Sequence, residues 1–428
     1  MLLVVAILML LIMAFFLIRG KVIPSVVLTI LPIIGALVVG TSFTDTMTFV
    51  AKGMISVLPV VALFIFSITY FGVMSDVGLF DRIIAFLVKR IGKSIYSVLA
   101  VTAAIAMVAH LDGSGVATLL ITVPAMLPVY KALKIRPLPL ALTVSLVISV
   151  MNMVPWGGPT ARAASVIGMD PAVLWHLMIP IQLAGIALIF IVLFFVARIE
   201  KKRSEFTRDI DIQASMQQLS DDEKALRRPK MWWPNLIITV LLLAALLVGV
   251  PSFIVFMVGC AIVIPLNYRS RKDQNERIKA HAKNILPMAV TIIGAGALLG
   301  VLDGTGMVDA LANGLLAIVP DSMKSMMHVI VGVLTTPMSV LLDADTMMYG
   351  ILPIVVQAAG TVGVSAASVA SIFIIGHNFG ITLCMTSAAV YFGLGLYGLE
   401  YKDAFRYSIG WTLGMGTLLI LLSALIIV

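Results

Sequence analysis

The chain has 428 residues, of which 61% are apolar and only 12% are charged, and its formal net charge is +8. A soluble domain carries about twice this share of charged residues, so the composition excludes a soluble globular protein and predicts an all-α polytopic membrane protein. The positive charge does not indicate nucleic-acid binding, because the basic residues lie in short segments between apolar runs. Cys260 and Cys384 both lie in apolar runs without CxxC spacing, which argues against a disulfide framework or a thiolate metal site.

Apolar runs that approach the length needed to cross a bilayer, about 20 residues, recur along the whole chain. Full spans are predicted at residues 2–18, 22–40, 54–75, 138–160, 173–198, 235–250, 251–267, 284–303, 367–392 and 407–428. Re-entrant hairpins are predicted at 95–130 and 325–360, and interfacial segments at 41–53, 76–94 and 304–324.

The basic residues predict the orientation of these spans. If the N-terminus is outside, every Lys and Arg except Lys52, Lys324 and Arg162 falls in a segment on the cytoplasmic side. The positive-inside rule therefore predicts an inner (plasma) membrane protein with both termini outside and loop 199–234 in the cytoplasm. Within this loop, Ser220 or a neighbour is expected to begin a short helix.

Each predicted hairpin has an acidic turn between two apolar arms that are too short to cross the membrane alone. The first turn contains His110 and Asp112, and the second contains Asp343 and Asp345. The three aspartates are candidates to ligate a coupled cation or metal, to carry a proton, or to cap the second arm. His110 is a candidate proton carrier or a buried polar residue whose hydrogen bonds are satisfied.

One span in each half is interrupted by a break of a second kind. Pro155-Trp-Gly-Gly-Pro159 cannot continue a helix, and the matching break is expected at 376–380, running on to 386–387. Helix N-termini at such breaks present N–H groups that bind carboxylate oxygens. The candidate anion-binding residues at these breaks are Asn152, Gly157, Gly158, Thr160, Asn378, Thr386 and Ser387.

Arg162 follows the first break and has no basic counterpart in the second half, where Ala388 aligns with it. An arginine inside a span costs about 2.5–3.5 kcal/mol on insertion scales, so it needs compensation. Its planar guanidinium matches a carboxylate, which makes it the candidate anion clamp. A salt bridge to one of the aspartates and extension to the outer interface are the alternatives.

Several motifs recur in the two halves at nearly constant separation. Residues 72–81 resemble residues 300–309, Asp112 matches Asp343, and residues 168–171 resemble 398–401. The spacing from Asn152 to Thr160 likewise matches that from Asn378 to Thr386. Each half has five predicted spans plus one hairpin, and an odd number of crossings reverses the second half. The sequence thus predicts two inverted repeats with binding residues near the membrane midplane.

Three motifs carry a resemblance to a known family: Tyr70-Phe-Gly-Val-Met-Ser-Asp-Val-Gly-Leu-Phe-Asp81, His110-Leu-Asp-Gly113 with residues 118–125, and residues 151–165. They resemble the citrate–metal–proton symporter (CitMHS) family of the ion transporter superfamily. The resemblance implies uptake of citrate, often as a complex with a divalent metal such as Mg²⁺ or Ca²⁺ and driven by protons. It also implies a homodimer that works by an elevator movement of a transport domain against a scaffold domain, and no permanently bound cofactor.

The expected domains follow from this resemblance and the repeat. They are scaffold helices at 1–94, a transport part at 95–198 with its broken helix at 138–167, a cytoplasmic linker at 199–234, scaffold helices at 235–324, and a transport part at 325–428 with its broken helix at 367–392.

The leading hypothesis is secondary active import of citrate or a related di- or tricarboxylate by proton symport. Sodium-coupled symport is the alternative for the coupling ion, because glycine-rich turns with Asn and Thr nearby also suit sodium. An anion channel is the alternative of a different class. An enzyme is not expected, since the sequence has no HExxH or GxSxG motif.

Overall fold

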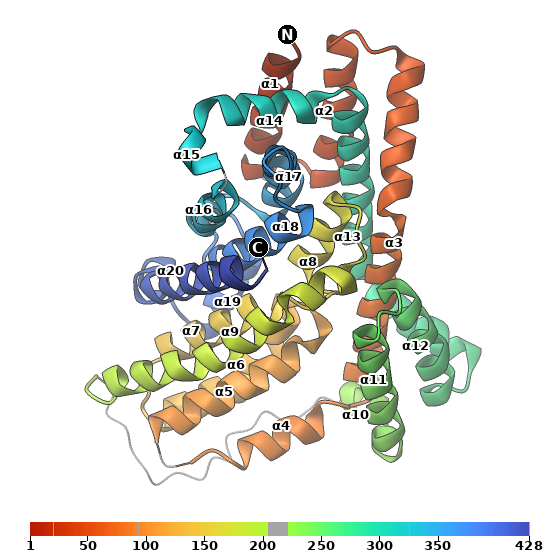
Figure 1. Ribbon diagram of the computed structural model, residues 1–428. Coiled ribbons are helices and arrows are strands. Elements are labelled where there is room, and N and C mark those ends of the chain that lie inside the picture. Colours follow the sequence, from red (N-terminus) through yellow and green to blue (C-terminus); the bar gives the residue numbers. More distant parts are fainter. Residues whose placement is uncertain (20, 93, 204–220, 325, 428) are drawn as a thin grey trace.

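The computed structural model describes the 428 residues except 20, 93, 204–220, 325 and 428. Within the described part every regular element is a helix (Figure 1), as the composition predicts. Seven helices are long and apolar enough to cross a membrane: Phe43–Asp76, Ile95–Asp112, Gly115–Ala132, Pro171–Glu200, Pro229–Leu247, Arg271–Gly304 and Tyr401–Ile426.

The helices of the first half include both arms of the predicted hairpin and both parts of the predicted broken helix. They are α1 (Leu2–Arg19), α2 (Pro24–Val38), α3 (Phe43–Asp76), α4 (Asp81–Val88), α5 (Ile95–Ala109), the short turn η1 (His110–Asp112), α6 (Gly115–Ala132), α7 (Leu138–Met151), α8 (Gly158–Val166) and α9 (Pro171–Glu200). Of the central linker, α10 (Asp221–Leu226) and η3 (Pro229–Met231) are described, whereas Ser220, the predicted helix start, lies outside the described residues.

The second half contains the same kinds of element in the same order. They are α11 (Trp232–Leu247), α12 (Ser252–Asn267), α13 (Arg271–Gly304), α14 (Met307–Ile318), α15 (Asp321–Lys324), α16 (Met327–Leu341), the π-helical turn η4 (Thr346–Ile351), α17 (Leu352–Gly360), α18 (Ala366–Ile381), α19 (Ala388–Tyr397) and α20 (Tyr401–Ile426).

Helices α3 and α13 pack against each other with their backbones in close approach. A Cβ on Gly53 would lie 2.0 Å from the carbonyl oxygen of Gly296, and a Cβ on Gly300 would lie 2.1 Å from that of Phe49. Only glycine permits this spacing, in which dispersion contacts between helices replace the hydrophobic driving force that lipid does not supply. Gly300, the first glycine of the 300–309 motif, therefore has a packing role.

Both of these helices begin earlier than predicted. Most of the segment 41–53, which was expected at the interface, belongs to α3, because Ser42 accepts a hydrogen bond from the Asp45 N–H and starts the helix at Phe43. Ser270 caps α13 in the same way through Asp273, so most of the basic segment predicted as a loop at 268–283 is helical. The hydrogen bonds of an N-cap allow a helix to continue into polar sequence, where hydropathy gives no signal.

The second helix break begins later than predicted, although it includes the expected residues 386–387. Helix α18 runs without interruption through residues 376–380, and the chain leaves the helix only at 382–387. The glycines that suggested a break instead let α18 approach α16: a Cβ on Gly380 would lie 2.1 Å from the Thr336 carbonyl oxygen, and one on Gly376 would lie 2.3 Å from that of Gly332.

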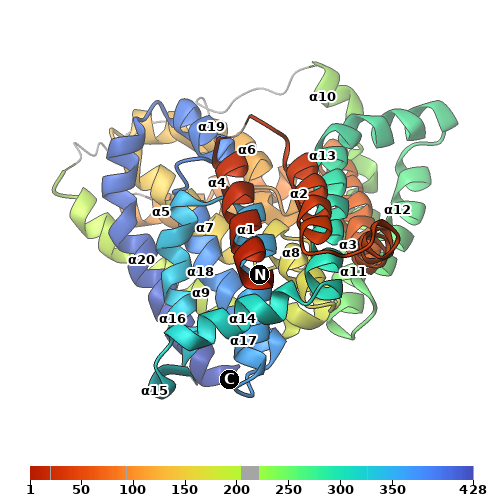
Figure 2. The same cartoon turned by 90° about the horizontal axis from the view of Figure 1, so that it is seen from above.

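The buried apolar side chains form three clusters. The largest joins α5, α6, α7, α9, α16, α17, α18 and α20. A second joins α3, α11, α12 and part of α13 with Val154, Trp156, Ala161 and Ala172 around the first break, and a third joins α1, α2, α13 and α14 with Tyr349 of η4. Figure 2 shows the corresponding separation, with α3, α12 and α13 on one side of the molecule and α16, α18 and α20 on the other.

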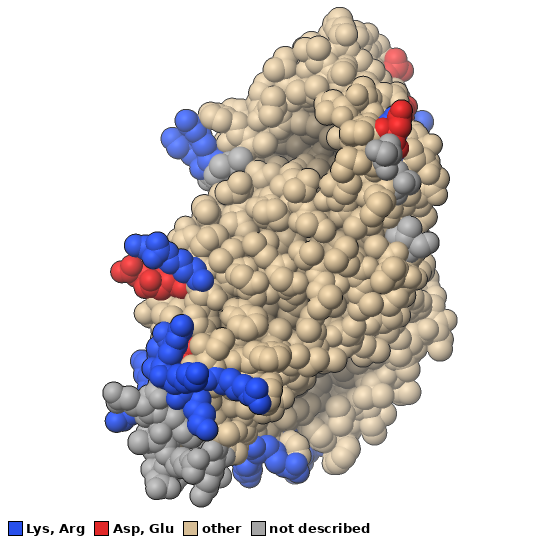
Figure 3. All heavy atoms as spheres, turned by 60° about the vertical axis from the view of Figure 1, so that its left-hand side comes forward, with Lys and Arg blue, Asp and Glu red and all other residues tan. Residues whose placement is uncertain are grey.

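Charged side chains are confined to small parts of the surface. Figure 3 shows a face that is mostly uncharged, with most of its Lys and Arg side chains gathered near one end. Large apolar side chains are exposed on outer helices, such as Leu11 on α1 and Leu241 on α11, which are 61% and 62% exposed. An exposed apolar belt of this kind fits contact with lipid.

Candidate functional site

The tip of the first hairpin is a compact turn made by η1 and the two residues after it. The Asp112 carboxylate accepts a hydrogen bond from the Ser114 N–H at 2.8 Å, and the Ser114 hydroxyl accepts one from the Ala117 N–H at 3.2 Å. Ser114 is therefore the residue that caps α6, while Asp112 holds the turn before it. Gly113 has φ +74°, a left-handed conformation that other residues adopt at a cost.

This tip is bonded to the helix break of its own half. The Trp156 indole N–H donates to the Leu111 carbonyl oxygen at 2.8 Å. His110 is fully buried, with its Nδ1 2.7 Å from the Thr118 hydroxyl and its Nε2 3.1 Å from the Asn152 side-chain oxygen. Of the two alternatives for His110, the structure shows the buried residue with both ring nitrogens hydrogen-bonded.

Predicted anion-binding residues at the first break are used in part to hold the break itself. The Thr160 hydroxyl donates to the Asn152 carbonyl oxygen at 2.9 Å. This bond satisfies a carbonyl that the interrupted helix leaves free. Gly157 precedes α8 as its N-cap in an extended conformation, and Gly158 is the first residue of α8.

The tip of the second hairpin is organised by Asp343. One carboxylate oxygen accepts hydrogen bonds from the N–H groups of Asp345 and Thr346, at 2.8 and 2.9 Å, and the other is 3.1 Å from the Thr346 hydroxyl. This tip, too, is bonded to the break of its own half, because the Met385 N–H donates to the Val340 carbonyl oxygen at 2.8 Å. Asp343 thus has the capping role that was one of its predicted alternatives.

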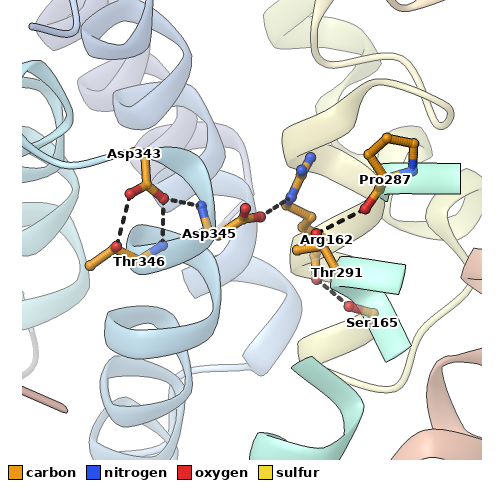
Figure 4. Close-up of polar contacts among 7 residues, drawn as sticks. All are labelled: Arg162, Ser165, Pro287, Thr291, Asp343, Asp345 and Thr346. Carbon is orange, nitrogen blue, oxygen red and sulfur yellow. Dashed lines mark hydrogen bonds and ion pairs between the residues drawn. The ribbon is translucent and has the colours of Figure 1, made fainter. Parts of the chain in front are cut away.

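The Asp345 side chain points away from this turn and forms an ion pair with Arg162 of α8 (Figure 4). The Arg162 Nε atom lies 2.8 Å from one carboxylate oxygen, and the two side chains are 12% and 15% exposed. This contact joins α8 of the first half to the hairpin tip of the second half. The structure therefore shows the salt-bridge alternative for Arg162 and not extension to the interface.

The terminal nitrogens of the Arg162 guanidinium lie beyond Nε, on the side away from the Asp345 carboxylate (Figure 4). Among the described residues, the ion pair to Asp345 is the one hydrogen bond that the Arg162 side chain makes, and it uses Nε alone. The Nη1 atom packs closely against Gly158, where a Cβ would lie only 2.9 Å from it. The terminal N–H groups, which form the bidentate fork of an arginine, thus remain free for an anion.

Polar groups on η4 and α18, near this ion pair, have side-chain atoms without a hydrogen-bond partner in the described part of the chain. Arg162 interacts electrostatically with Tyr349 and His377, which lie on η4 and α18. His377 bonds to Ser339 through Nδ1 at 2.8 Å, but its Nε2 has no partner in the described part of the chain. Both side-chain atoms of the fully buried Asn378 are likewise without a partner there. Buried unpaired groups of this kind are rare and indicate a functional site or a missing ligand.

A cavity of about 180 Å³ lies beside the breaks, between α6, α7, α19 and α20. Asn152 and Ser387, from the two predicted breaks, both line it. Arg162 is not among its lining residues. The Thr386 hydroxyl, also from the second break, lies 3.1 Å from the Cys384 sulfur. The predicted residues therefore form two neighbouring groups, one around the Arg162 ion pair and one around this cavity.

The three predicted metal-ligand candidates do not form one metal site. No group of three or more His, Cys, Asp or Glu residues in the described part of the chain is close enough to hold a metal ion. Asp112 bonds to its own turn at the first hairpin tip, whereas Asp343 and Asp345 lie at the second. The three candidates therefore do not form one group of ligands in this structure, and a cation site at either tip stays a prediction.

Sequence reasoning did not select Trp156 or Tyr349 as site residues. Trp156 lies in the break that was predicted at 155–159, so its position there was the available signal. Tyr349 lies in the π-helical turn η4, within an arm of the predicted second hairpin that was not expected to be irregular.

The fold is similar to solved transporter structures. The *Alcanivorax borkumensis* YdaH transporter matches with a TM-score of 0.60 and 15% identity, covering 89% of this chain and 87% of that one. *Neisseria gonorrhoeae* MtrF, from a class of antimetabolite efflux pumps, matches with a TM-score of 0.60 and 12% identity, covering 88% and 83%. At these identities the likeness shows the fold alone.

Sequence comparison identifies the family. The family model of the CitMHS citrate transporters matches residues 1–280. A *Bacillus subtilis* (strain 168) citrate transporter is 33% identical over 429 residues, covering 100% of this chain and 99% of its own. A Mg(2+)/citrate complex secondary transporter from the same organism is 34% identical over 397 residues, covering 92% and 90%.

The chain belongs to the citrate transporter family, as its sequence motifs predicted. It is a multi-pass membrane transporter and not an enzyme.

The packing of Gly113 against the first break yields a prediction. A Cβ at this position would lie 2.8 Å from the Trp156 Cδ1 atom and 2.9 Å from its carbonyl oxygen, in addition to the strain of φ +74°. Gly113→Ala should therefore destabilise the protein by about 2 kcal/mol or more and lower its Tm in detergent. Gly115→Ala is the matched control, since its nearest atoms would be 3.8 Å away. Equal melting temperatures for the two variants would contradict the tip–break packing.

Proposed function

We propose that the protein is a secondary active transporter that imports citrate or a related di- or tricarboxylate. The observation that carries the proposal is the buried Arg162, which lies next to a helix break with its terminal N–H groups free. In a chain of the citrate transporter family, a guanidinium in this position is suited to clamp a substrate carboxylate.

Neighbouring groups supply the remaining contacts that a polycarboxylate needs. The unpaired amide of Asn378 offers an N–H donor, and Ser387 and Asn152 line the adjacent cavity. The N-terminus of α8 at residues 157–158 adds backbone N–H groups of favourable dipole. The Thr160 hydroxyl already donates a hydrogen bond to the Asn152 carbonyl oxygen. Its role in the proposal is therefore to stabilise the helix break.

We further propose two inverted repeats and an elevator movement. The matched bonding of each hairpin tip to the break of its own half supports the repeat. The apolar clusters support a division into a scaffold, at 1–94 and 235–324, and a transport domain, at 95–198 and 325–428 with their hairpins and broken helices, because most residues of each cluster fall in one of the two domains. Residues 199–234 would link the halves on the cytoplasmic side, and a homodimer would hold two scaffolds together. A cross-link between α3 and α13 should leave transport intact, whereas one that joins α3 to α8 should stop an elevator.

The proposed orientation has both termini outside, and its support is the distribution of basic residues. Both native cysteines are buried, so an introduced cysteine can report on its own accessibility. Lys272→Cys at the exposed start of α13 should resist a membrane-impermeant thiol reagent in intact cells and react after permeabilisation, whereas Thr44→Cys should react in both. The reverse pattern would refute this orientation.

The coupled cation in the proposal is a proton, with Asp112, Asp343, Asp345 and His110 as the residues that respond to it; sodium is the alternative. Each of these side chains already makes hydrogen bonds or an ion pair, so binding a cation there must rearrange the hairpin tips. A Mg²⁺ or Ca²⁺ ion would be carried as part of the substrate, as the name of one relative states for magnesium.

Uptake of labelled citrate into proteoliposomes tests the function and its coupling. An inward proton gradient should drive accumulation above equilibrium, and an equal sodium gradient should not. Added Mg²⁺ or Ca²⁺ should increase the rate if the complex is carried. Saturable uptake is expected, whereas non-saturating currents that follow voltage alone would favour the anion channel instead.

Neutralising the guanidinium tests the site. Arg162→Gln should reduce citrate uptake at least 100-fold, since a buried charge-assisted contact to an anion is worth about 3 kcal/mol or more. The exposed Arg406 on α20 provides the control variant, Arg406→Gln, which has the same change of charge. Normal uptake by a well-folded Arg162→Gln protein would remove Arg162 from the proposal.

A further inference from the structure

We propose that Asp345 is an internal substitute for the substrate carboxylate, which occupies Arg162 in the empty site and is displaced when the substrate binds. This inference rests on the proposed function of Arg162 as the anion clamp. The observation behind it is that the guanidinium already holds a carboxylate, through one Nε–oxygen contact of 2.8 Å.

The two aspartates at this hairpin tip are held very differently. Asp343 accepts hydrogen bonds from Asp345, Thr346 and the Thr346 hydroxyl, so both of its oxygens are committed to the turn. Asp345 makes its one side-chain hydrogen bond, within the described part of the chain, to Arg162. Figure 4 shows the two carboxylates pointing in opposite directions, with Asp345 directed toward Arg162. Asp343 is a structural residue of the tip, whereas Asp345 can leave its partner without breaking the turn.

The ion pair uses only part of the hydrogen-bonding capacity of Arg162, so a substrate carboxylate that makes more hydrogen bonds can replace Asp345. A guanidinium binds a carboxylate best through two parallel N–H bonds, and Asp345 uses one. The Nη1 atom lies close against Gly158, the first residue of α8, and makes no hydrogen bond within the described part of the chain. A free carboxylate that reaches the terminal nitrogens can form the bidentate pair that the hairpin does not supply.

Exchange of one carboxylate for another also avoids an energetic barrier. A buried guanidinium without a partner is strongly destabilising, because the cost of removing it from water is not repaid. With Asp345 in place, Arg162 has an anion before the substrate arrives and during its release. The pair also joins α8 to the tip of the other half, so displacement by substrate frees that tip from α8.

When the substrate displaces Asp345, its carboxylate loses the Arg162 guanidinium as its positively charged partner. The divalent metal of a metal–citrate complex would arrive at the same moment as the citrate, and the released carboxylate would face it. Anion binding to Arg162 and cation binding near Asp345 would therefore strengthen each other, as linkage requires.

Citrate binding to the purified full-length protein, without added divalent metal and with EDTA present, tests the substitution. Asp345→Asn removes the competing carboxylate and should tighten the citrate Kd about tenfold relative to the unmodified protein. Asp345→Glu keeps a competing carboxylate and should bind citrate within about threefold of the unmodified protein. Asp303→Asn, at an exposed position of α13, is the control for the change in net charge and should have no effect.

A second readout covers the loss of stability expected when Arg162 has no partner. Citrate should raise the Tm of Asp345→Asn by more than that of the unmodified protein, and the double variant Arg162→Gln with Asp345→Asn should lose this effect. Equal or weaker citrate binding by Asp345→Asn, or a citrate effect that survives in the double variant, would overturn the inference. Absence of citrate binding by the unmodified protein would instead refute the proposed function.

Discussion

The structure depends on how backbone groups at four interruptions are satisfied away from water. Helices within a membrane satisfy their own N–H and C=O groups, and a turn or a break leaves some of them without a partner. In this chain each hairpin tip and the break of its own half provide these bonds for each other, through Trp156 and Leu111 in the first half and Met385 and Val340 in the second. The interruptions must therefore lie together, and polar side chains such as His110, Asn152 and Asn378 are brought to the same region.

The Arg162–Asp345 pair adds a contact between the two halves to this arrangement. It joins α8 to the tip that follows α16, and it lies among the unpaired groups of His377 and Asn378. The pair has no counterpart in the other half, where Ala388 aligns with Arg162. The site thus combines near-symmetric backbone breaks with one asymmetric cation, which suits an anion that approaches a single guanidinium fork.

The elements that the sequence predicted well are those with strong local signals. The acidic turns were correctly placed between two helices in each half, and Pro155 to Pro159 gave the first break, because proline and glycine act within a few residues. The arms of the first unit, Ile95–Asp112 and Gly115–Ala132, are however long enough to cross a membrane, so their predicted shortness is wrong. The reasoning from glycine also failed at 376–380, where glycines serve close helix packing on α16 in an unbroken helix. Composition does not distinguish a glycine that ends a helix from one that admits a neighbour. The early starts of α3 and α13 were missed because serine caps extend helices into polar sequence.

The sequence by itself determined the class of protein, the positions of its hairpins and the candidate residues, since hydropathy, charge and turn chemistry are local properties. It also identified the family, because the motifs at 70–81 and 151–165 are contiguous. It left three alternatives open for Arg162 and three for each aspartate. Only the tertiary structure separated Asp343, which holds its own turn, from Asp345, which reaches a residue 183 positions away. The two aspartates are only two positions apart in the chain. Their different roles arise from the direction of each side chain in the folded protein, since Asp343 faces its own turn and Asp345 faces α8.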